Sequence, residues 1–167
     1  MVFGKIKLKN FELKKSNLKL INDLKLLIKE NNKILNTLKP TYKYSYSKST
    51  ILRNKKFTKL NIIGMGGSIL GVEAIYDFLK NKIKKKIVFF NNLIPNLKIK
   101  KNNKKNLNLI ISKSGNTLET IVNSNILIKN KSKNIFIVEN QKNYLNNLAK
   151  KLKGEIIEHK NYIGGRY

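Results

Sequence analysis

The sequence predicts an α/β fold: a three-layer α/β/α sandwich around a central parallel sheet, preceded by an N-terminal helix. Short apolar runs rich in β-branched residues recur along the chain, and stretches with the periodicity of amphipathic helices separate them. Runs that are apolar at every position are typical of parallel strands covered on both faces. The 167 residues, 41% of them hydrophobic, suffice for one domain with a real core but not comfortably for two.

The N-terminal helix is expected over residues 16–38. Apolar side chains recur there at helical spacing, Ser16 is placed to cap the first turn, and Pro40 ends the helix. Residues 41–56, in which tyrosines alternate with lysines and serines, are expected to form a connecting segment. Alternating aromatic and basic residues can also stack on single-stranded nucleic acid, but we prefer half-buried tyrosines here.

Strands and helices are expected to alternate in the rest of the chain. The expected strands span residues 60–63, 87–90, 107–111 and 135–138, with one further short strand at 155–157. The helices expected between them span about 69–79, 117–130 and 141–152, and a solvated loop of lysine and asparagine spans 98–105. The domain division that follows is a helical and connecting segment, residues 1–56, and an α/β domain, residues 57–167.

A glycine-rich segment, residues 64–71, follows the first strand of the α/β domain, where open α/β sheets bind ligands. Glycines let the backbone turn sharply and approach a ligand closely, and Ser68 adds a hydroxyl at the helix entry. The dinucleotide pattern G-x-G-x-x-G is only partly matched, because residue 69 is isoleucine and no acidic residue ends the next strand. A P-loop is excluded, since no Gly-Lys-Ser/Thr follows. A simple packing turn between strand and helix is the alternative.

A hydroxyl-rich segment, residues 112–120, follows the strand at 107–111 and enters a helix. Its hydroxyl and backbone N–H groups, the partly positive helix N-terminus and the charge of Lys113 all suit a phosphate monoester. Similar residues also serve only to cap helices. The preceding strand and the Thr117-x-x-Thr120 helix entry favour the phosphate site.

The last residues include Gly164-Gly165-Arg166, which presents a guanidinium suited to an anion or a developing oxyanion, although such a sequence alone is commonly a loop. His159 is expected to be a surface or capping residue. The chain has no cysteine and one histidine, which excludes disulfides, a cysteine nucleophile and a multi-histidine metal centre within it. No metal ion is expected.

The net charge of +27 invites a nucleic-acid-binding interpretation. Of the 36 basic residues, however, only Arg53 and Arg166 are arginines, and nucleic-acid binders favour arginine for bidentate and stacking contacts. The lysines are spread over the chain together with many asparagines and isoleucines, as A+T-rich codons produce. No specific nucleic-acid partner is expected, and a polyanion-binding basic protein is kept as an alternative.

The chain is expected to be cytoplasmic and not to associate with membranes. No uninterrupted apolar stretch approaches the roughly 20 residues that span a bilayer. The N-terminus lacks the apolar core and small-residue cleavage site of a secretory signal.

Three segments in this order, residues 64–71, 112–120 and 164–166, closely resemble the signatures of the phosphoglucose isomerase family. The middle segment is shared across the wider sugar isomerase (SIS) domain superfamily. The elements Gly-Gly-Ser-x-Leu-Gly and Gly-Gly-Arg narrow the resemblance to the phosphoglucose isomerase family. The resemblance covers residues 55–167 and implies an SIS-type sandwich. The family interconverts glucose 6-phosphate and fructose 6-phosphate in glycolysis and gluconeogenesis, without cofactor, through ring opening and a cis-enediolate.

The resemblance also implies roles for particular residues. The phosphate is expected to bind at Ser112, Lys113 (through its backbone), Ser114 and Thr117. Gly67 and Ser68 are expected to line the sugar site. Arg166 is expected to stabilise the negative charge of the enediolate. The loop has Ser-Gly-Asn where many members have Thr-Phe-Thr, which leaves fewer hydroxyls. Related SIS loops also use Ser-Gly-Asn-Thr.

Family members continue beyond Gly-Gly-Arg into a second SIS domain, which supplies the glutamate base, the ring-opening histidine and a C-terminal lysine. No base is assigned here, because the candidate glutamates lack the motif; these are Glu119, Glu139, Glu155 and Glu158. We therefore expect the N-terminal half of an isomerase, from a truncated product, a split gene or an incomplete reading frame. It should bind sugar phosphate weakly at most, without turnover.

The expected partners are a sugar phosphate, a polypeptide carrying the second half, and, in the full-length family, a second copy in a homodimer. Besides the polyanion-binding alternative, two further alternatives to the phosphoglucose isomerase interpretation remain. One is a non-catalytic SIS domain that senses a sugar phosphate in a regulator. The other is a different SIS isomerase, such as a phosphoglucose/phosphomannose or pentose-phosphate enzyme.

Overall fold

The structure is a computed structural model that describes most of the chain. The described residues are 17–30, 32–93, 106–128 and 132–164, together with the backbone of two short strands, β1 (Val2–Phe3) and β2 (Ile6–Lys7). The chain divides into two compact units, Met1–Tyr42 and Lys43–Tyr167. Every predicted site residue that the structure describes lies in the second unit.

The first unit contains the helices α1 (Leu18–Lys29) and α2 (Lys33–Asn36). Each begins at an asparagine whose side-chain oxygen accepts a hydrogen bond from the backbone two residues on, at 3.0 Å for Asn17 and 2.8 Å for Asn32. Such a bond satisfies one of the backbone N–H groups that the first turn of a helix leaves without a partner.

The single helix predicted over residues 16–38 was therefore wrong at its centre. The backbone is extended at Glu30 and Asn32, and Asn32 starts a second helix. The predicted cap, Ser16, lies outside the described residues, and the observed cap is Asn17. Helical spacing of apolar residues continues across the break, which is why periodicity alone did not locate it.

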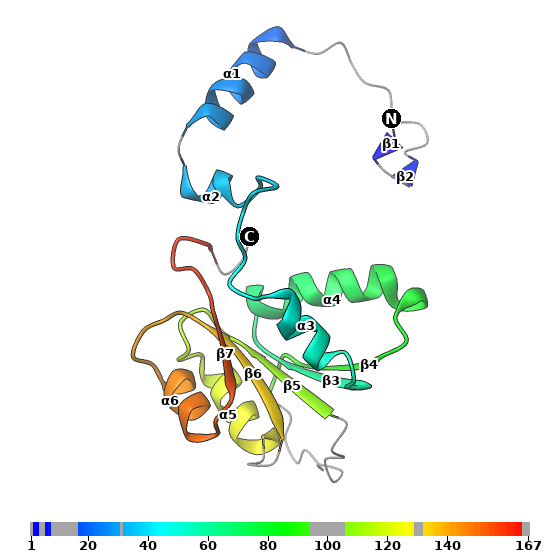
Figure 1. Cartoon of the computed structure of the whole chain (residues 1–167), viewed down its shortest axis with the longest axis vertical. Coiled ribbons are helices and arrows are strands. Elements are labelled where there is room, and N and C mark those ends of the chain that lie inside the picture. The colour runs from blue at the N-terminus through cyan, green and yellow to red at the C-terminus, as the bar shows by residue number, and fades with distance from the viewer. Residues whose placement is uncertain are drawn as a thin grey trace. The chain divides into compact units, whose positions relative to one another are not determined.

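The second unit is built on a five-stranded sheet in which every neighbouring pair is parallel, in the order β4-β3-β5-β6-β7 (Figure 1). The strands are β3 (Lys59–Ile63), β4 (Lys86–Phe90), β5 (Asn106–Ile111), β6 (Lys133–Val138) and β7 (Glu155–Glu158). All of them coincide with predicted strands. Because the strands are parallel, their carboxyl ends meet at one edge of the sheet.

Helices cover both faces of the sheet, which confirms the predicted three-layer α/β/α sandwich (Figure 1). They are α3 (Lys48–Asn54), α4 (Gly67–Leu79), the short 3₁₀ helix η1 (Lys80–Lys82), α5 (Leu118–Leu127) and α6 (Tyr144–Lys151). The connection from β3 through α4 to β4 runs toward one edge of the sheet, whereas the connections through α5 and α6 run toward the other edge. Because crossovers between parallel strands are right-handed, α4 lies on the face opposite α5 and α6. None of the helices in the described ranges combines the length and hydrophobicity that a bilayer-spanning segment needs.

Two predictions about loops had different outcomes. The connecting segment predicted at 41–56 was wrong in part, since it contains α3, whose N-cap Ser47 accepts a hydrogen bond from the Thr50 N–H at 3.2 Å. The solvated loop predicted at 98–105 lies outside the described residues.

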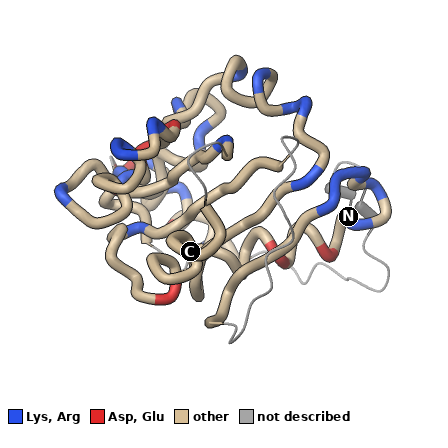
Figure 2. Tube along the Cα trace, turned by 90° about the horizontal axis from the view of Figure 1, so that it is seen from below, with Lys and Arg blue, Asp and Glu red and all other residues tan. Residues whose placement is uncertain are grey.

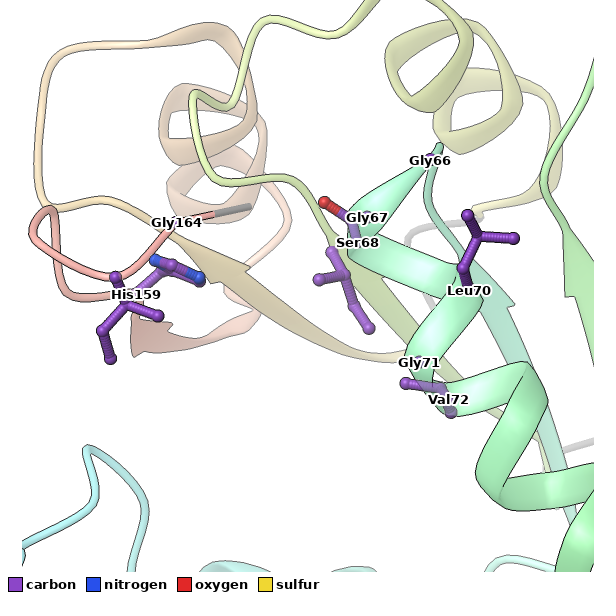
Figure 3. Close-up of a pocket in the computed structure, with 10 residues that line it drawn as sticks. Gly66, Gly67, Ser68, Leu70, Gly71, Val72, His159 and Gly164 are labelled. Carbon is purple, nitrogen blue, oxygen red and sulfur yellow. The ribbon is translucent and has the colours of Figure 1, made fainter. Parts of the chain in front are cut away.

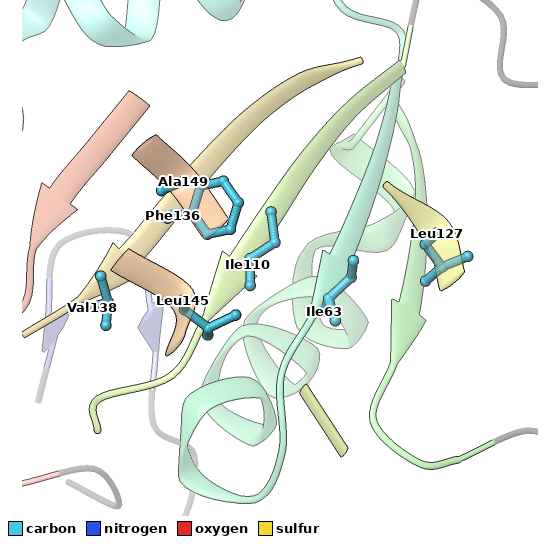
Figure 4. Close-up of a cluster of buried hydrophobic side chains, with 7 residues drawn as sticks. All are labelled: Ile63, Ile110, Leu127, Phe136, Val138, Leu145 and Ala149. Atoms are coloured by element: carbon cyan, nitrogen blue, oxygen red, sulfur yellow. The ribbon is translucent and has the colours of Figure 1, made fainter. Parts of the chain in front are cut away.

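The main core lies between the sheet and the helices α5 and α6 (Figure 4). Each strand in it contributes side chains that are apolar and fully buried, and the helices contribute their inner faces. The cluster consists of Ile63, Ile110, Leu127, Phe136, Val138, Leu145 and Ala149. A smaller cluster of Phe57, Leu107 and Ile135 lies on the opposite face of the sheet.

A row of three buried asparagines crosses the sheet at the same level. The Asn61 amide donates to the Asn108 side-chain oxygen and the Asn108 amide donates to that of Asn134, both at 2.8 Å. The Asn134 amide in turn donates to the Ser132 carbonyl at 3.1 Å. All three amide groups are therefore hydrogen-bonded inside an otherwise apolar layer, as buried amides require, whereas the side-chain oxygen of Asn61 has no partner among the described residues.

Basic residues are dispersed over the second unit, where Lys and Arg occupy several separate turns and helix ends of the trace (Figure 2). Acidic residues are few, with nine in the whole chain. One of them, Glu155, lies where three donors converge.

The carboxylate of Glu155 connects α3 to the sheet. It accepts a hydrogen bond from the Thr50 hydroxyl at 3.2 Å and from the Arg53 guanidinium at 3.0 Å, and Lys133 Nζ lies 3.4 Å from its other oxygen. Burial alone would raise the pKa of Glu155, but the hydrogen bonds from Thr50 and Lys133 and the positive charges of Lys133 and Arg53 outweigh it. Its pKa is therefore lowered from the ordinary glutamate value.

We predict that Glu155→Gln makes the stability of the protein less sensitive to acid. A carboxyl group whose pKa is lowered by folding stabilises the native state above its unfolded-state pKa, about 4.3, and loses that contribution as the pH falls through its folded-state pKa. Urea unfolding at pH 7 and pH 3 should therefore show a larger drop for the natural protein than for the variant. At pH 7 the variant should be less stable by about 1 kcal/mol. Equal pH dependence of the two proteins would contradict this.

Candidate functional site

The turn between β3 and α4 is shaped by two glycines. The Gly64 N–H donates to the Phe90 carbonyl at 3.2 Å, and a Cβ at this position would lie 3.1 Å from the Ile111 carbonyl oxygen. Gly66 has a φ of +54°, a conformation that side chains with a Cβ rarely adopt. Its carbonyl accepts the first hydrogen bonds of α4, including that from the Leu70 N–H at 3.1 Å. The turn thus brings the first residues of α4 to the edge of the sheet.

The loop after β5 folds around the hydroxyl of Ser112, which is almost fully buried. This oxygen accepts a hydrogen bond from the Gly115 N–H at 3.2 Å and lies 3.0 Å from the Thr117 hydroxyl oxygen. The Asn116 N–H donates to the Ser114 hydroxyl at 3.3 Å. Ser112 therefore holds the loop in shape, while Ser114 is exposed and Thr117 is half-buried at the start of α5.

Gly115 lets this loop pack directly against the start of α6. Its φ is +69°, and a Cβ there would come within 2.2 Å of the Asn143 side-chain oxygen. Asn143 is the N-cap of α6, whose oxygen accepts a hydrogen bond from the Asn146 N–H at 2.9 Å. The Gly115 carbonyl accepts a further bond from the Leu145 N–H at 3.1 Å. No larger residue fits here without moving the cap.

The two loops, together with Glu139, line a small open pocket of about 290 Å³. The structure thereby brings together two loops that are far apart in the sequence. The lining residues are Met65, Gly67, Ser68, Lys113, Ser114, Thr117 and Glu139. Ser112 is not among them, and it reaches the pocket only through its contact with Thr117.

Figure 3 shows a larger pocket, of about 690 Å³. It shares Gly67 and Ser68 with the small pocket. Its opposite wall comes from the segment after β7, which contributes His159, Ile163 and Gly164. The first residue of the C-terminal motif is thus placed beside the glycine turn. Gly165 and Arg166 lie outside the described residues, so the predicted role of Arg166 stays a prediction.

Sequence reasoning missed Glu139 as a pocket residue. It follows β6 directly and is buried, with Oε1 3.7 Å from Lys113 Nζ, and its other carboxylate oxygen accepts a hydrogen bond from the Gln141 amide. The backbone N–H of Glu139 also donates to the Lys113 carbonyl at 3.0 Å. The sequence could have indicated Glu139 only by its position directly after a predicted strand, because the carboxyl ends of parallel strands form the edge of the sheet at which ligands bind.

His159 also differs from the prediction of a surface or capping residue. It is half-buried and lines the larger pocket, facing the first turn of α4 across it (Figure 3). A lone histidine carries no motif, so only the parallel placement of the segment after β7 reveals its position.

The arrangement suits an anion next to a larger uncharged group. The small pocket offers the hydroxyls of Ser114 and Thr117 at the N-terminus of the ten-residue helix α5, whose end is partly positive. Lys113 supplies a positive charge, which Glu139 partly offsets. The larger pocket is mostly glycine and aliphatic side chains.

Comparison with curated proteins finds glucose-6-phosphate isomerases. The chain is 41% identical over 101 residues to that of Borrelia garinii, which covers 54% of this chain and 19% of the relative. It is 34% identical over 150 residues to that of Treponema denticola (80% and 28%) and 34% identical over 142 residues to that of Mycoplasmoides gallisepticum (75% and 33%). The chain thus spans between about a fifth and a third of the length of these relatives. It is similar to a part of glucose-6-phosphate isomerases, as its motifs predicted.

Solved structures agree on the fold. A hypothetical protein from Thermus thermophilus matches 69% of this chain with a TM-score of 0.59 and 19% identity, over 31% of its own length. The Vibrio vulnificus NanR protein, complexed with ManNAc-6P, matches 70% of this chain with a TM-score of 0.51 and 16% identity, over 43% of its own length. No protein-family model matches the chain.

We predict that Gly115→Ala destabilises the loop after β5 and weakens anion binding. The added Cβ would meet the side chain of Asn143, and the positive φ is itself unfavourable for alanine. We expect a loss of about 2–3 kcal/mol in the free energy of unfolding measured with urea. Gly71→Ala, within α4 and with no atom near its added Cβ, is the matched control and should be neutral or slightly stabilising. Equal effects of the two changes would contradict this account.

We predict that Glu139→Gln tightens the binding of inorganic phosphate. The change removes a buried negative charge that faces the pocket and leaves Lys113 without its ion-pair partner. Isothermal titration should show an increase in affinity of about 3- to 10-fold. Glu119→Gln removes a similar charge from the first turn of α5, outside the pocket lining, and should have a smaller effect.

Proposed function

We propose that this chain binds the phosphate of glucose 6-phosphate and fructose 6-phosphate and forms that part of an aldose–ketose isomerase. The observation that supports it best is the small pocket, in which the loops 64–71 and 112–120 face each other. Similarity to a part of glucose-6-phosphate isomerases supports the same conclusion. In this proposal residues 57–167 act as an SIS-type domain, the first of two.

The phosphate group is proposed to occupy the small pocket. Ser114 and Thr117 donate their hydroxyls, and Lys113 contributes a backbone N–H and a partly neutralised charge. Ser112 acts by fixing the position of Thr117 and the turn at Gly115, because its hydroxyl is committed to both. A phosphate bound mainly by hydroxyl and amide donors needs no full counter-charge from the pocket.

The sugar is proposed to extend from there into the larger pocket. Gly67 and Ser68 line both pockets, so a ligand that fills the small one must pass these residues to reach the other. The lack of a side chain at Gly67 leaves room for the sugar chain, and the Ser68 hydroxyl can hydrogen-bond it. This geometry fits a phosphate at one end of a polyhydroxy chain.

Arg166 is proposed to stabilise the negative charge of the enediolate, since it follows the pocket residue Gly164 by two positions. Glu139 is not proposed as the base, because it lies at the phosphate end and faces Lys113. The base is proposed to come from a second-half polypeptide, because the relatives extend well beyond the matched part. A homodimer and a cytoplasmic location are likewise proposals.

We predict that glucose 6-phosphate and fructose 6-phosphate bind the chain and that unphosphorylated glucose binds far more weakly. Thr117→Val and Ser114→Ala should each lower the affinity for both sugar phosphates by about 2- to 13-fold, the effect of losing one hydrogen bond of about 0.5–1.5 kcal/mol. Ser49→Ala, a hydroxyl deletion on α3 away from the pocket, is the control. Isothermal titration measures each affinity.

Two results would contradict the proposal. Equal affinity for glucose and glucose 6-phosphate would show that the chain does not bind the phosphate group. Measurable isomerase activity of the purified chain would show that a base is present after all.

A further inference from the structure

The backbone of His159 continues the sheet beyond β7. Its N–H donates to the carbonyl of Val138, the last residue of β6, at 2.9 Å. The residue is therefore fixed to the carboxyl edge of the sheet by the same pairing that joins β6 and β7. Its side chain starts from a rigid element rather than from a free loop.

The imidazole ring makes a local hydrogen bond at one of its two nitrogens. Its Nδ1 lies 3.0 Å from the Lys160 carbonyl oxygen. A carbonyl oxygen only accepts hydrogen bonds, so this contact requires a hydrogen on Nδ1. In the neutral ring the other nitrogen, Nε2, then carries the lone pair and is a hydrogen-bond acceptor.

Polar groups are scarce on the walls of the larger pocket. Among the described residues that line it, only Ser68 and His159 have polar side chains. The remaining lining residues are glycine or aliphatic, namely Gly66, Gly67, Leu70, Gly71, Val72, Ile111, Ile163 and Gly164. Figure 3 shows Ser68 and His159 on opposite sides of the pocket. A polyhydroxy ligand crossing it would meet one polar side chain on each side.

We propose that His159 is a sugar-binding residue, whose Nε2 accepts a hydrogen bond from a hydroxyl of the sugar chain in the larger pocket. Ser68 and His159 then define the orientation of that chain, while the phosphate lies in the small pocket. This inference rests on the proposed function, because it assumes a sugar phosphate that spans both pockets. It adds a residue specific for the sugar, separate from those that hold the phosphate.

Two substitutions separate the Nε2 contact from the local bond to Lys160. In His159→Asn the amide can still donate to the Lys160 carbonyl, but nothing replaces Nε2. In His159→Gln the longer side chain places a polar group near the position of Nε2. We expect His159→Asn to lower the affinity for glucose 6-phosphate by about 2- to 13-fold, as for one lost hydrogen bond, and His159→Gln to retain most of it.

Inorganic phosphate is the matched ligand, because it fills the small pocket only. Its affinity should be the same in the natural protein and in both variants. Loss of glucose 6-phosphate affinity with unchanged phosphate affinity supports the proposal. An unchanged glucose 6-phosphate affinity in His159→Asn, or an equal loss for both ligands, overturns it.

A direct measurement avoids substitutions altogether. His159 is the only histidine in the chain, so its ring nitrogens are unambiguous in an NMR spectrum of ¹⁵N-labelled protein. The Nε2 resonance should shift when glucose 6-phosphate is added and stay in place with inorganic phosphate. An Nε2 resonance that stays in place while titration shows glucose 6-phosphate bound overturns the role of His159 alone. No binding of glucose 6-phosphate to the natural protein overturns the proposed function and this inference with it.

Discussion

Parallel strand pairing is the constraint on which the rest of the second unit depends. In register, Ile63 at the end of β3 is level with Ile110 of β5, and Val138 at the end of β6 is level with Glu158 of β7. Segments far apart in the sequence therefore leave the sheet side by side. The glycine turn, the hydroxyl loop, Glu139 and the segment after β7 are neighbours for this reason. No contact among the loops themselves needs to bring them together.

Much of the fold could be predicted from the sequence because most side chains of the strands are apolar on both faces. That pattern persists whatever the tertiary contacts are, so the strands of the sheet were all found. The break between α1 and α2 could not be found in the same way, because Asn32 starts a helix by a local hydrogen bond that apolar periodicity does not register. The seven-residue helix α3 was missed since it is short and rich in polar residues.

The candidate site shows a similar division. The two loops could be recognised because glycine and hydroxyl residues cluster in them, and Gly66 and Gly115 indeed adopt positive φ values. Glu139 and His159 carry no local pattern, and they belong to the pockets only because the strands before them are parallel neighbours. Single residues that act through tertiary placement are beyond a motif-based prediction. The same holds for the pairing of Lys113 with Glu139, which changes the charge that the pocket presents.

The asparagine row also selects one alignment of the strands. Alternation of faces resists a slip by one residue but not by two, because a two-residue slip restores the original faces. In this sheet such a slip would move Asn108 from Asn61 to a position opposite Ile63 or Lys59. The amides would then be buried without partners, at a cost of about 1–3 kcal/mol each. The row thus favours one register of β3 and β5. In this register the ends of the two strands, and the loops that follow them, lie at the same level.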